Sequence, residues 1–133
     1  MSEKRSTKIR VIRPEDVIWE EAMRGPGEPE APGEEYTATQ SVDEKFCVGL
    51  WRRDAQSRRF ERPYHEVAYV IEGQIEITDD VDGEVVVAGP GDILVTPQGS
   101  RGYWKSLTPV KMVRGIYEEV GADLDSYIGP GAF

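Results

Sequence analysis

The sequence contains a single histidine, His65, and a single cysteine, Cys47, among its 133 residues. One histidine cannot supply the three imidazoles of a common metal centre within one chain, and the ligand spacings of zinc fingers are absent. One cysteine excludes an intrachain disulfide, which is consistent with a reducing compartment, so we expect a cytoplasmic protein. Any chemistry must therefore depend mainly on Arg, Glu, Tyr and Trp side chains.

The sequence also lacks long apolar segments and an excess of positive charge. Its longest uninterrupted apolar run has five residues, Val67 to Ile71, so no segment is predicted to span a membrane. Residues 1–13 are polar and lack the apolar region of a signal peptide. Sixteen Lys and Arg residues against 25 Asp and Glu residues give a net charge of −9. This balance argues against a nucleic-acid partner and against an anionic membrane surface.

Residues 1–43 are predicted to form an N-terminal arm that contains one short helix. Pro14 followed by two acidic residues is typical of a helix start. We expect two or three helical turns whose buried face consists of Val17, Ile18 and Met23. Residues 8–12 could form a short edge strand. Residues 25–35 contain three Gly, three Pro and four Glu, which predicts an exposed connector.

Residues 44–119 are predicted to form a single all-β barrel. Short segments rich in β-branched and aromatic residues alternate there with turn signals such as Asp82-Gly83 and Gly89-Pro90-Gly91. The tail, residues 120–133, ends in aromatic and apolar residues, which we expect to pack against the barrel or a second subunit. The predicted strands are 46–52, 58–62, 66–72, 74–79, 84–88, 92–96, 102–106 and 110–117.

Two motifs carry a family resemblance. Residues 64–73 read Tyr-His-Glu-Val-Ala-Tyr-Val-Ile-Glu-Gly, and residues 91–99 read Gly-Asp-Ile-Leu-Val-Thr-Pro-Gln-Gly. In this order they resemble the two motifs of the cupin superfamily. The following Gly102-Tyr103-Trp104 and Val113-Arg114 segments are similar to small cupins related to ureidoglycine aminohydrolases and to the ethanolamine-utilisation (EutQ) type. The resemblance implies a double-stranded β-helix, a jelly-roll barrel with a pocket at one mouth, and a homodimer.

The resemblance fails at the positions that would bind metal. The family's two histidines before the motif glutamate correspond to Phe60 and Arg62, or to Arg59 and Glu61 with the longer spacing. The third histidine corresponds to Gly102. Only Glu66 of the usual ligand set remains, and one carboxylate cannot hold a transition metal with useful affinity. We therefore expect no metal and no cofactor.

Strand parity predicts which side chains share the pocket. If Glu66 faces the interior, as the resemblance implies, then Arg62 and Tyr64 precede it on the same face. His65 then points to the opposite face. Near the second motif, Gly102 is expected to open space and Trp104 to form a flat pocket wall. Because guanidinium groups bind carboxylate and phosphate bidentately, an anionic or zwitterionic ligand is a reasonable hypothesis.

Each of these residues also has a purely structural interpretation. Glu66 can be an ion-pair partner of an arginine inside the barrel. The arginines at positions 52, 53, 58, 59 and 62 can form a solvated face or a dimer contact instead of a ligand clamp. Trp104 can belong to the core, and His65 can be a surface group. Cys47 is expected to be a buried small hydrophobic residue.

Three functions are compatible with the sequence. The first is a cupin that binds a small polar or anionic metabolite in the barrel without a three-histidine metal site. The second is a lyase, isomerase or hydrolase in which Glu66 is the general base, Tyr64 or His65 is the acid partner, and Arg62 holds a substrate carboxylate. The third is a structural dimer module whose pocket is no longer used.

Overall fold

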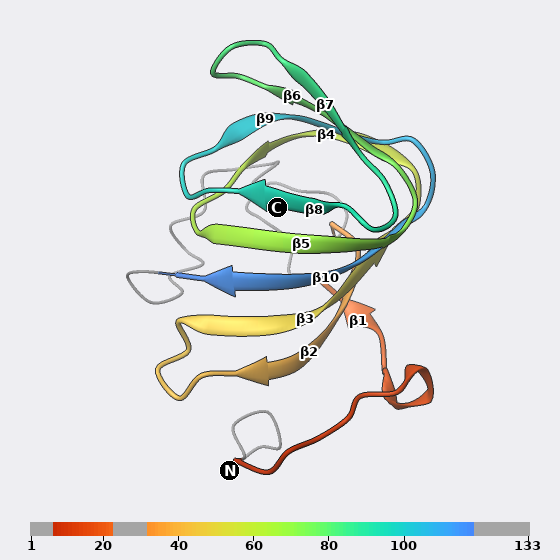
Figure 1. Cartoon of the computed structure of the whole chain (residues 1–133), viewed down its shortest axis with the longest axis vertical. Helices are drawn as coiled ribbons and strands as arrows, with labels where there is room; N and C mark the ends of the chain where they lie inside the picture. Colours follow the sequence, from red (N-terminus) through yellow and green to blue (C-terminus); the bar gives the residue numbers. More distant parts are fainter. Residues whose placement is uncertain (1–6, 23–31, 119–133) are drawn as a thin grey trace.

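The computed structural model describes residues 7–22 and 32–118, which form two antiparallel sheets (Figure 1). Within these ranges the one helix is a 3₁₀ turn, Pro14–Asp16, and no helix is long and apolar enough to cross a membrane. The six-stranded sheet has the order β1 (Glu20–Glu21), β2 (Glu34–Gln40), β3 (Phe46–Arg53), β10 (Val110–Tyr117), β5 (His65–Glu72) and β8 (Ile93–Thr96). The four-stranded sheet has the order β4 (Gln56–Glu61), β9 (Arg101–Ser106), β6 (Ile75–Asp79) and β7 (Val85–Ala88).

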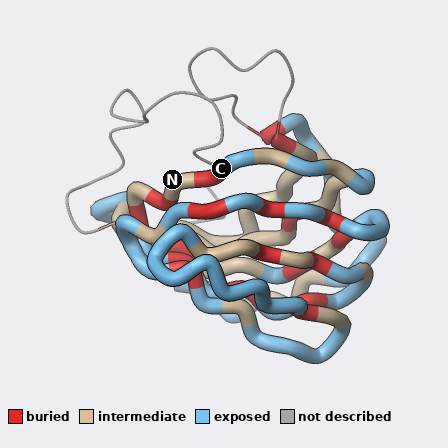
Figure 2. The backbone as a smooth tube through the Cα atoms, turned by 90° about the horizontal axis from the view of Figure 1, so that it is seen from above, coloured by how far each residue is buried: buried red, intermediate tan, exposed pale blue. Residues whose placement is uncertain are grey.

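Alternating burial along the strands shows that the two sheets face each other. Buried and exposed residues alternate along β5 and β9. In Figure 2, buried segments recur as short red bands along the strands. Successive side chains of a strand point to opposite faces, so this alternation places one face of each sheet on a shared interior. The all-β jelly-roll prediction is confirmed.

Aromatic residues join the two sheets at the centre of the core. Trp51 of β3 meets Trp104 of β9 edge to face, with ring centroids 6.2 Å apart, and Phe60 of β4 meets Trp104 at 6.1 Å. Such edge-to-face contacts are favourable beyond the apolar area that they bury. The Trp104 indole Nε1–H donates a hydrogen bond of 2.9 Å to the Ser106 hydroxyl, so its polar group is satisfied in the interior.

All eight predicted barrel strands are present, with boundaries that agree to within two residues. The sequence interpretation missed β1 and β2, which pair with each other and extend the larger sheet. β2 begins at Glu34, at the end of the segment interpreted as a connector. Most of that connector, and the tail 120–133, lie outside the described residues.

The predicted N-terminal helix is wrong. Residues 14–16 form a single 3₁₀ turn in which the Arg13 N–H donates to the Asp16 carboxylate, and the backbone is extended again at Val17. Ile18 is 72% exposed, and Met23 lies outside the described residues. Pairing of β1 with β2 overrides the helix signal, and Arg52 lies 4.1 Å above the Trp19 ring. Residues 8–12 are not a strand.

Gly73, between β5 and β6, is the turn at which glycine matters most. Its φ of +92° lies in the region that L-residues with side chains rarely adopt, and an added Cβ would lie 2.2 Å from the Pro109 carbonyl oxygen. Gly83 has a similar φ of +73°, but nothing lies within 4 Å of the corresponding Cβ position. Substitutions at the two glycines therefore distinguish the cost of backbone strain, which both share, from the cost of a steric collision, which arises only at Gly73.

We predict that Gly73→Ala costs at least about 3 kcal/mol of unfolding free energy, because strain and collision add, and Gly83→Ala about 1 kcal/mol. Urea unfolding of both variants measures the difference. Equal losses for the two variants would show that the contact with Pro109 does not constrain the turn.

Candidate functional site

The segment between β4 and β5 brings a row of polar side chains into the barrel. The Arg62 N–H donates to the Ser100 carbonyl at 2.9 Å, and the Arg62 carbonyl accepts from the Gly99 N–H at 2.7 Å. These backbone bonds hold the segment against the turn that follows β8. Arg62, Tyr64 and Glu66 are all buried, as strand parity predicts, while His65 between them is exposed.

Arg62 and Glu66 form a buried ion pair. Each is only 4% exposed, and the Arg62 Nε lies 3.4 Å from the Glu66 Oε2. Three atoms of this pair have no hydrogen-bond partner among the described residues: Nε and Nη1 of Arg62, and Oε2 of Glu66. Buried charged groups that lack hydrogen bonds are costly, so these atoms would gain from a hydrogen bond to water or to a ligand.

Aromatic rings hold the Arg62 guanidinium in place. Its Cζ lies 5.0 Å from the centroid of Phe60 and 5.6 Å from the centroid of Trp104. Both distances are within the range of cation–π attraction, which strengthens when the cation is desolvated. The predicted role of Trp104 as a flat wall is therefore compatible with its place in the core, because one ring serves both purposes.

A second arginine, Arg114 of β10, reaches the same interior. Its Nη2 donates to the Glu35 carboxylate of β2 at 2.8 Å, and its Cζ lies 6.0 Å from the Trp51 ring. Burial lowers the pKa of Arg114, but the charges of Glu66, Tyr64 and Glu35 outweigh this effect and raise it overall. Arg114 therefore keeps its positive charge inside the barrel.

These residues surround a small central cavity of about 20 Å³. That volume holds about one water molecule. Four arginines line the cavity together with one carboxylate, so its wall carries an excess of positive charge in a chain of net charge −9. The lining residues are Trp51, Arg53, Gln56, Arg58, Arg62, Glu66, Trp104, Ser106, Met112 and Arg114.

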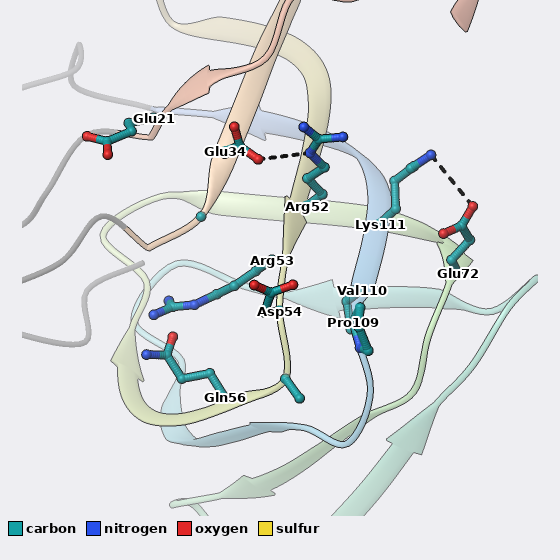
Figure 3. A pocket seen from close by; sticks show the side chains of 12 residues that line it. Glu21, Glu34, Arg52, Arg53, Asp54, Gln56, Glu72, Pro109, Val110 and Lys111 are labelled. Carbon is teal, nitrogen blue, oxygen red and sulfur yellow. Dashed lines mark hydrogen bonds and ion pairs between the residues drawn. The ribbon is translucent and has the colours of Figure 1, made fainter.

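A much larger groove of about 840 Å³ lies beside the ends of β3 and β5 and the start of β10 (Figure 3). Two ion pairs lie along it, Arg52 with Glu34 at 3.0 Å and Lys111 with Glu72 at 3.6 Å. Arg53 and Gln56 line both the groove and the central cavity. The groove and the cavity therefore adjoin at these two side chains.

Strand parity divides the five arginines at positions 52, 53, 58, 59 and 62 into an inward-facing and an outward-facing group. Arg53, Arg58 and Arg62 line the central cavity. Arg52 and Arg59 lie on the outside, where Arg59 forms a bidentate ion pair with Asp80. The cluster is thus partly an interior group and partly a solvated face.

Two of the predicted site residues do not join this site. His65 lies on the outer face, where its ring stacks on Tyr117 and its Nδ1 accepts a hydrogen bond of 3.2 Å from the Gln98 N–H. Gly102 faces inward, but the expected space beside it is absent, since a Cβ there would lie 2.1 Å from the Thr78 carbonyl oxygen. Gly102 permits close approach of β9 to β6.

Sequence reasoning missed Arg114 and Glu35 as members of the site. Arg114 was noticed only as part of a motif, although its parity with the inward-facing Met112 could have placed it in the interior. Glu35 carried no such signal, because β2 was not predicted. Cys47 is half-buried on β3, where burial raises the pKa of its thiol, so it is not an activated nucleophile.

The donor set does not fit a three-histidine metal centre. Across residues 7–22 and 32–118, no three His, Cys, Asp or Glu side chains are grouped so that they could hold a metal ion. Glu66 is the one family ligand present, and the Arg62 guanidinium beside it would repel a cation.

Comparisons with known proteins give a family match. The model of the EutQ-like cupin domain matches residues 40–113. Among curated proteins, none matches the sequence significantly.

Solved structures share the fold. A DUF861 family protein from Thermotoga maritima is 29% identical, with a TM-score of 0.50 over 57% of this chain and 83% of that one. A putative ethanolamine utilization protein Q from Salmonella typhimurium is 22% identical, with a TM-score of 0.65 over 82% and 85%. The polyketide cyclase RemF from Streptomyces resistomycificus is 16% identical, with a TM-score of 0.64 over 84% and 81%.

We predict that Glu66→Gln remains folded but loses about 3 kcal/mol of unfolding free energy, because Arg62 is left as a buried charge without its counter-charge. The matched control is Glu72→Gln, which removes an exposed ion pair with Lys111 and should cost less than about 1 kcal/mol. Urea unfolding compares the variants. A loss for Glu66→Gln no larger than that of the control would exclude a structural role for the buried pair.

Proposed function

Because the chain belongs to the EutQ-like cupin domain family, we propose that it binds a small anionic metabolite inside the barrel and does so without a three-histidine metal centre. The observation that carries this proposal is the buried Arg62 guanidinium, whose Nε and Nη1 lack hydrogen-bond partners among the described residues. A carboxylate or phosphate oxygen is the acceptor that best matches these two donors.

The charge of the interior supports an anion over a cation. Four guanidinium groups line the cavity, whereas Glu66 and Glu35 are the carboxylates on or beside it. Glu35 is already engaged by Arg114 at 2.8 Å. The four guanidinium groups therefore favour an incoming anion, while an incoming cation would compete with arginine for Glu66.

The dimensions of the two spaces indicate how a ligand would be held. The central cavity admits about one water molecule, so an anionic group can enter only if a water leaves and an arginine side chain moves. The groove of about 840 Å³ is within the usual size range of small-molecule sites. In this proposal the body of the ligand lies in the groove and its anionic end reaches past Arg53 toward Arg62.

One observation favours a second candidate, an enzyme of lyase, isomerase or hydrolase type. Tyr64 and Glu66 are both buried on the interior face, where they could act as acid and base on a substrate held by Arg62. The exposed His65 has no part in this version. The two candidates differ in outcome, because the enzyme would convert its ligand and the binding protein would release it unchanged.

A thermal-shift panel tests the proposal. It contains the anions malonate, oxalate and inorganic phosphate, with cationic ethylamine and uncharged urea as comparisons. We expect one or more anions to raise the melting temperature, since a ligand at a hundredfold excess over its Kd adds about 2.7 kcal/mol of stability. Arg62→Met should abolish this shift, because it removes the guanidinium and keeps an apolar stem of similar length.

Arg59→Met is the matched control, because Arg59 lies on the outside and pairs with Asp80. It should bind as the parent chain does. An anion that stabilises the Arg62→Met variant as strongly as the parent would remove Arg62 from the site. Stabilisation by ethylamine alone would contradict the anionic class of ligand.

Metal content provides a separate check. Tag-free protein purified without chelators should carry far less than one equivalent of Mn, Fe, Ni or Zn per chain, because Glu66 is the sole family ligand present. Elemental analysis measures this. A full equivalent that disappears in the Glu66→Gln variant would contradict the metal-free site.

A further inference from the structure

Donors and an acceptor that lack partners meet in the interior of the barrel. Nε and Nη1 of Arg62 are donors, Oε2 of Glu66 is an acceptor, and all three are buried without a hydrogen-bond partner among the described residues. A ligand that carries only a carboxylate can satisfy the two donors, but it leaves the acceptor unsatisfied, because an ionised carboxylate has no proton to donate. The interior therefore matches a ligand that carries a hydrogen-bond donor in addition to its anionic group.

The distance between these atoms indicates where on the ligand the donor lies. The Arg62 Nε and the Glu66 Oε2 are 3.4 Å apart, and both side chains are 4% exposed. Hydrogen bonds of ordinary length to both residues place the ligand's acceptor and its donor close together. The donor is therefore attached next to the carboxyl group and not at the far end of the ligand.

The size and the charge of the central cavity favour a hydroxyl as this donor. The cavity of about 20 Å³ has room for about one water molecule, and a hydroxyl group is of similar size. A hydroxyl accepts hydrogen bonds as well as donating them, so it can lie among guanidinium groups, whereas an ammonium group only donates. An ammonium group would also add positive charge to a wall that carries four arginines and one carboxylate.

We propose, resting on the function proposed above, that the preferred anion is a 2-hydroxy acid, whose carboxylate accepts from Arg62 and whose neighbouring hydroxyl donates to Glu66. Glu66 then has a role in recognition in addition to its ion pair with Arg62. Its Oε2 is the atom that distinguishes a hydroxy acid from the corresponding unsubstituted acid.

A second buried acceptor borders the same cavity. Oε1 of Gln56 also lacks a hydrogen-bond partner among the described residues, and Gln56 lies where the cavity adjoins the groove. Glu66 is the better acceptor for the hydroxyl, because it is adjacent to Arg62 and because hydrogen bonds to a charged acceptor are stronger than those to a neutral one. Variants of Glu66 and Gln56 separate the two acceptors.

Titration calorimetry of the full chain with matched acids tests the proposal. The pairs are malonate with hydroxymalonate and propionate with lactate, and alanine is the amino counterpart of lactate. Each hydroxy acid should bind at least about tenfold more tightly than its unsubstituted partner, because its hydroxyl gains a hydrogen bond to a buried charged acceptor. Alanine should bind no more tightly than propionate.

Glu66→Met should reduce the affinity ratio within each pair to about one, because it removes the acceptor and keeps a side chain of similar length. Glu66→Gln keeps a neutral acceptor oxygen, so its ratio should lie between one and that of the parent, and it serves as the comparison if Glu66→Met does not fold. Glu61→Met is the matched control, because Glu61 pairs with Arg101 at 3.5 Å and lines neither the cavity nor the groove. It should keep the ratio of the parent.

The outcomes separate this proposal from the anion site itself. Equal binding of hydroxy and unsubstituted acids by the parent would overturn the 2-hydroxy acid and leave the anion site intact. Tighter binding of alanine than of lactate would assign the donor to an ammonium group and would also overturn it. So would a preference that both Glu66 variants keep at parental strength, or one that Gln56→Met removes. If the parent binds none of these acids, the proposed anion site fails and the 2-hydroxy acid fails with it.

Discussion

The buried pair of Arg62 and Glu66 is the constraint on which the interior of this barrel depends. Two opposite charges, each 4% exposed, lie 3.4 Å apart between the two sheets. Such a pair is expensive to desolvate, so the structure surrounds it with rings that attract a cation and with a further arginine, Arg114. By the sequence resemblance, the positions of the family's metal-binding histidines carry Phe60 and Arg62, or Arg59 and Glu61, together with Gly102 in this chain.

The architecture explains why so many charges converge on one small space. Antiparallel pairing places Arg114 beside both β3 and β5, so it faces the same interior as Glu66. The Trp51–Trp104 contact fixes the separation of the two sheets at this level. The result is a barrel whose centre is cationic although the molecule as a whole is acidic.

Much of this could be predicted from local sequence, and several of the failures have a common cause. The two-residue period of β5 correctly placed Arg62, Tyr64 and Glu66 inside and His65 outside. Strand β2 and the position of Glu35 depend on pairing between segments far apart in the chain, which no local pattern encodes. The parity of β10 alone, in contrast, could have placed Arg114 inside. The helix expected after Pro14 failed for the same reason, since pairing of β1 with β2 favours extended backbone. The prediction that Gly102 opens space was wrong, because a glycine can also mark a place where two strands pack closely.

The central claim is that Arg62 is the anchor for an anionic group inside the barrel. A crystal structure of the parent chain grown with malonate tests it most directly. The account predicts density for a carboxylate within hydrogen-bond distance of the Arg62 Nε and Nη1, with the adjoining arginine side chains displaced relative to a malonate-free crystal. An interior that contains only water, with the Arg62–Glu66 pair unchanged at malonate concentrations that saturate any thermal shift, would contradict it.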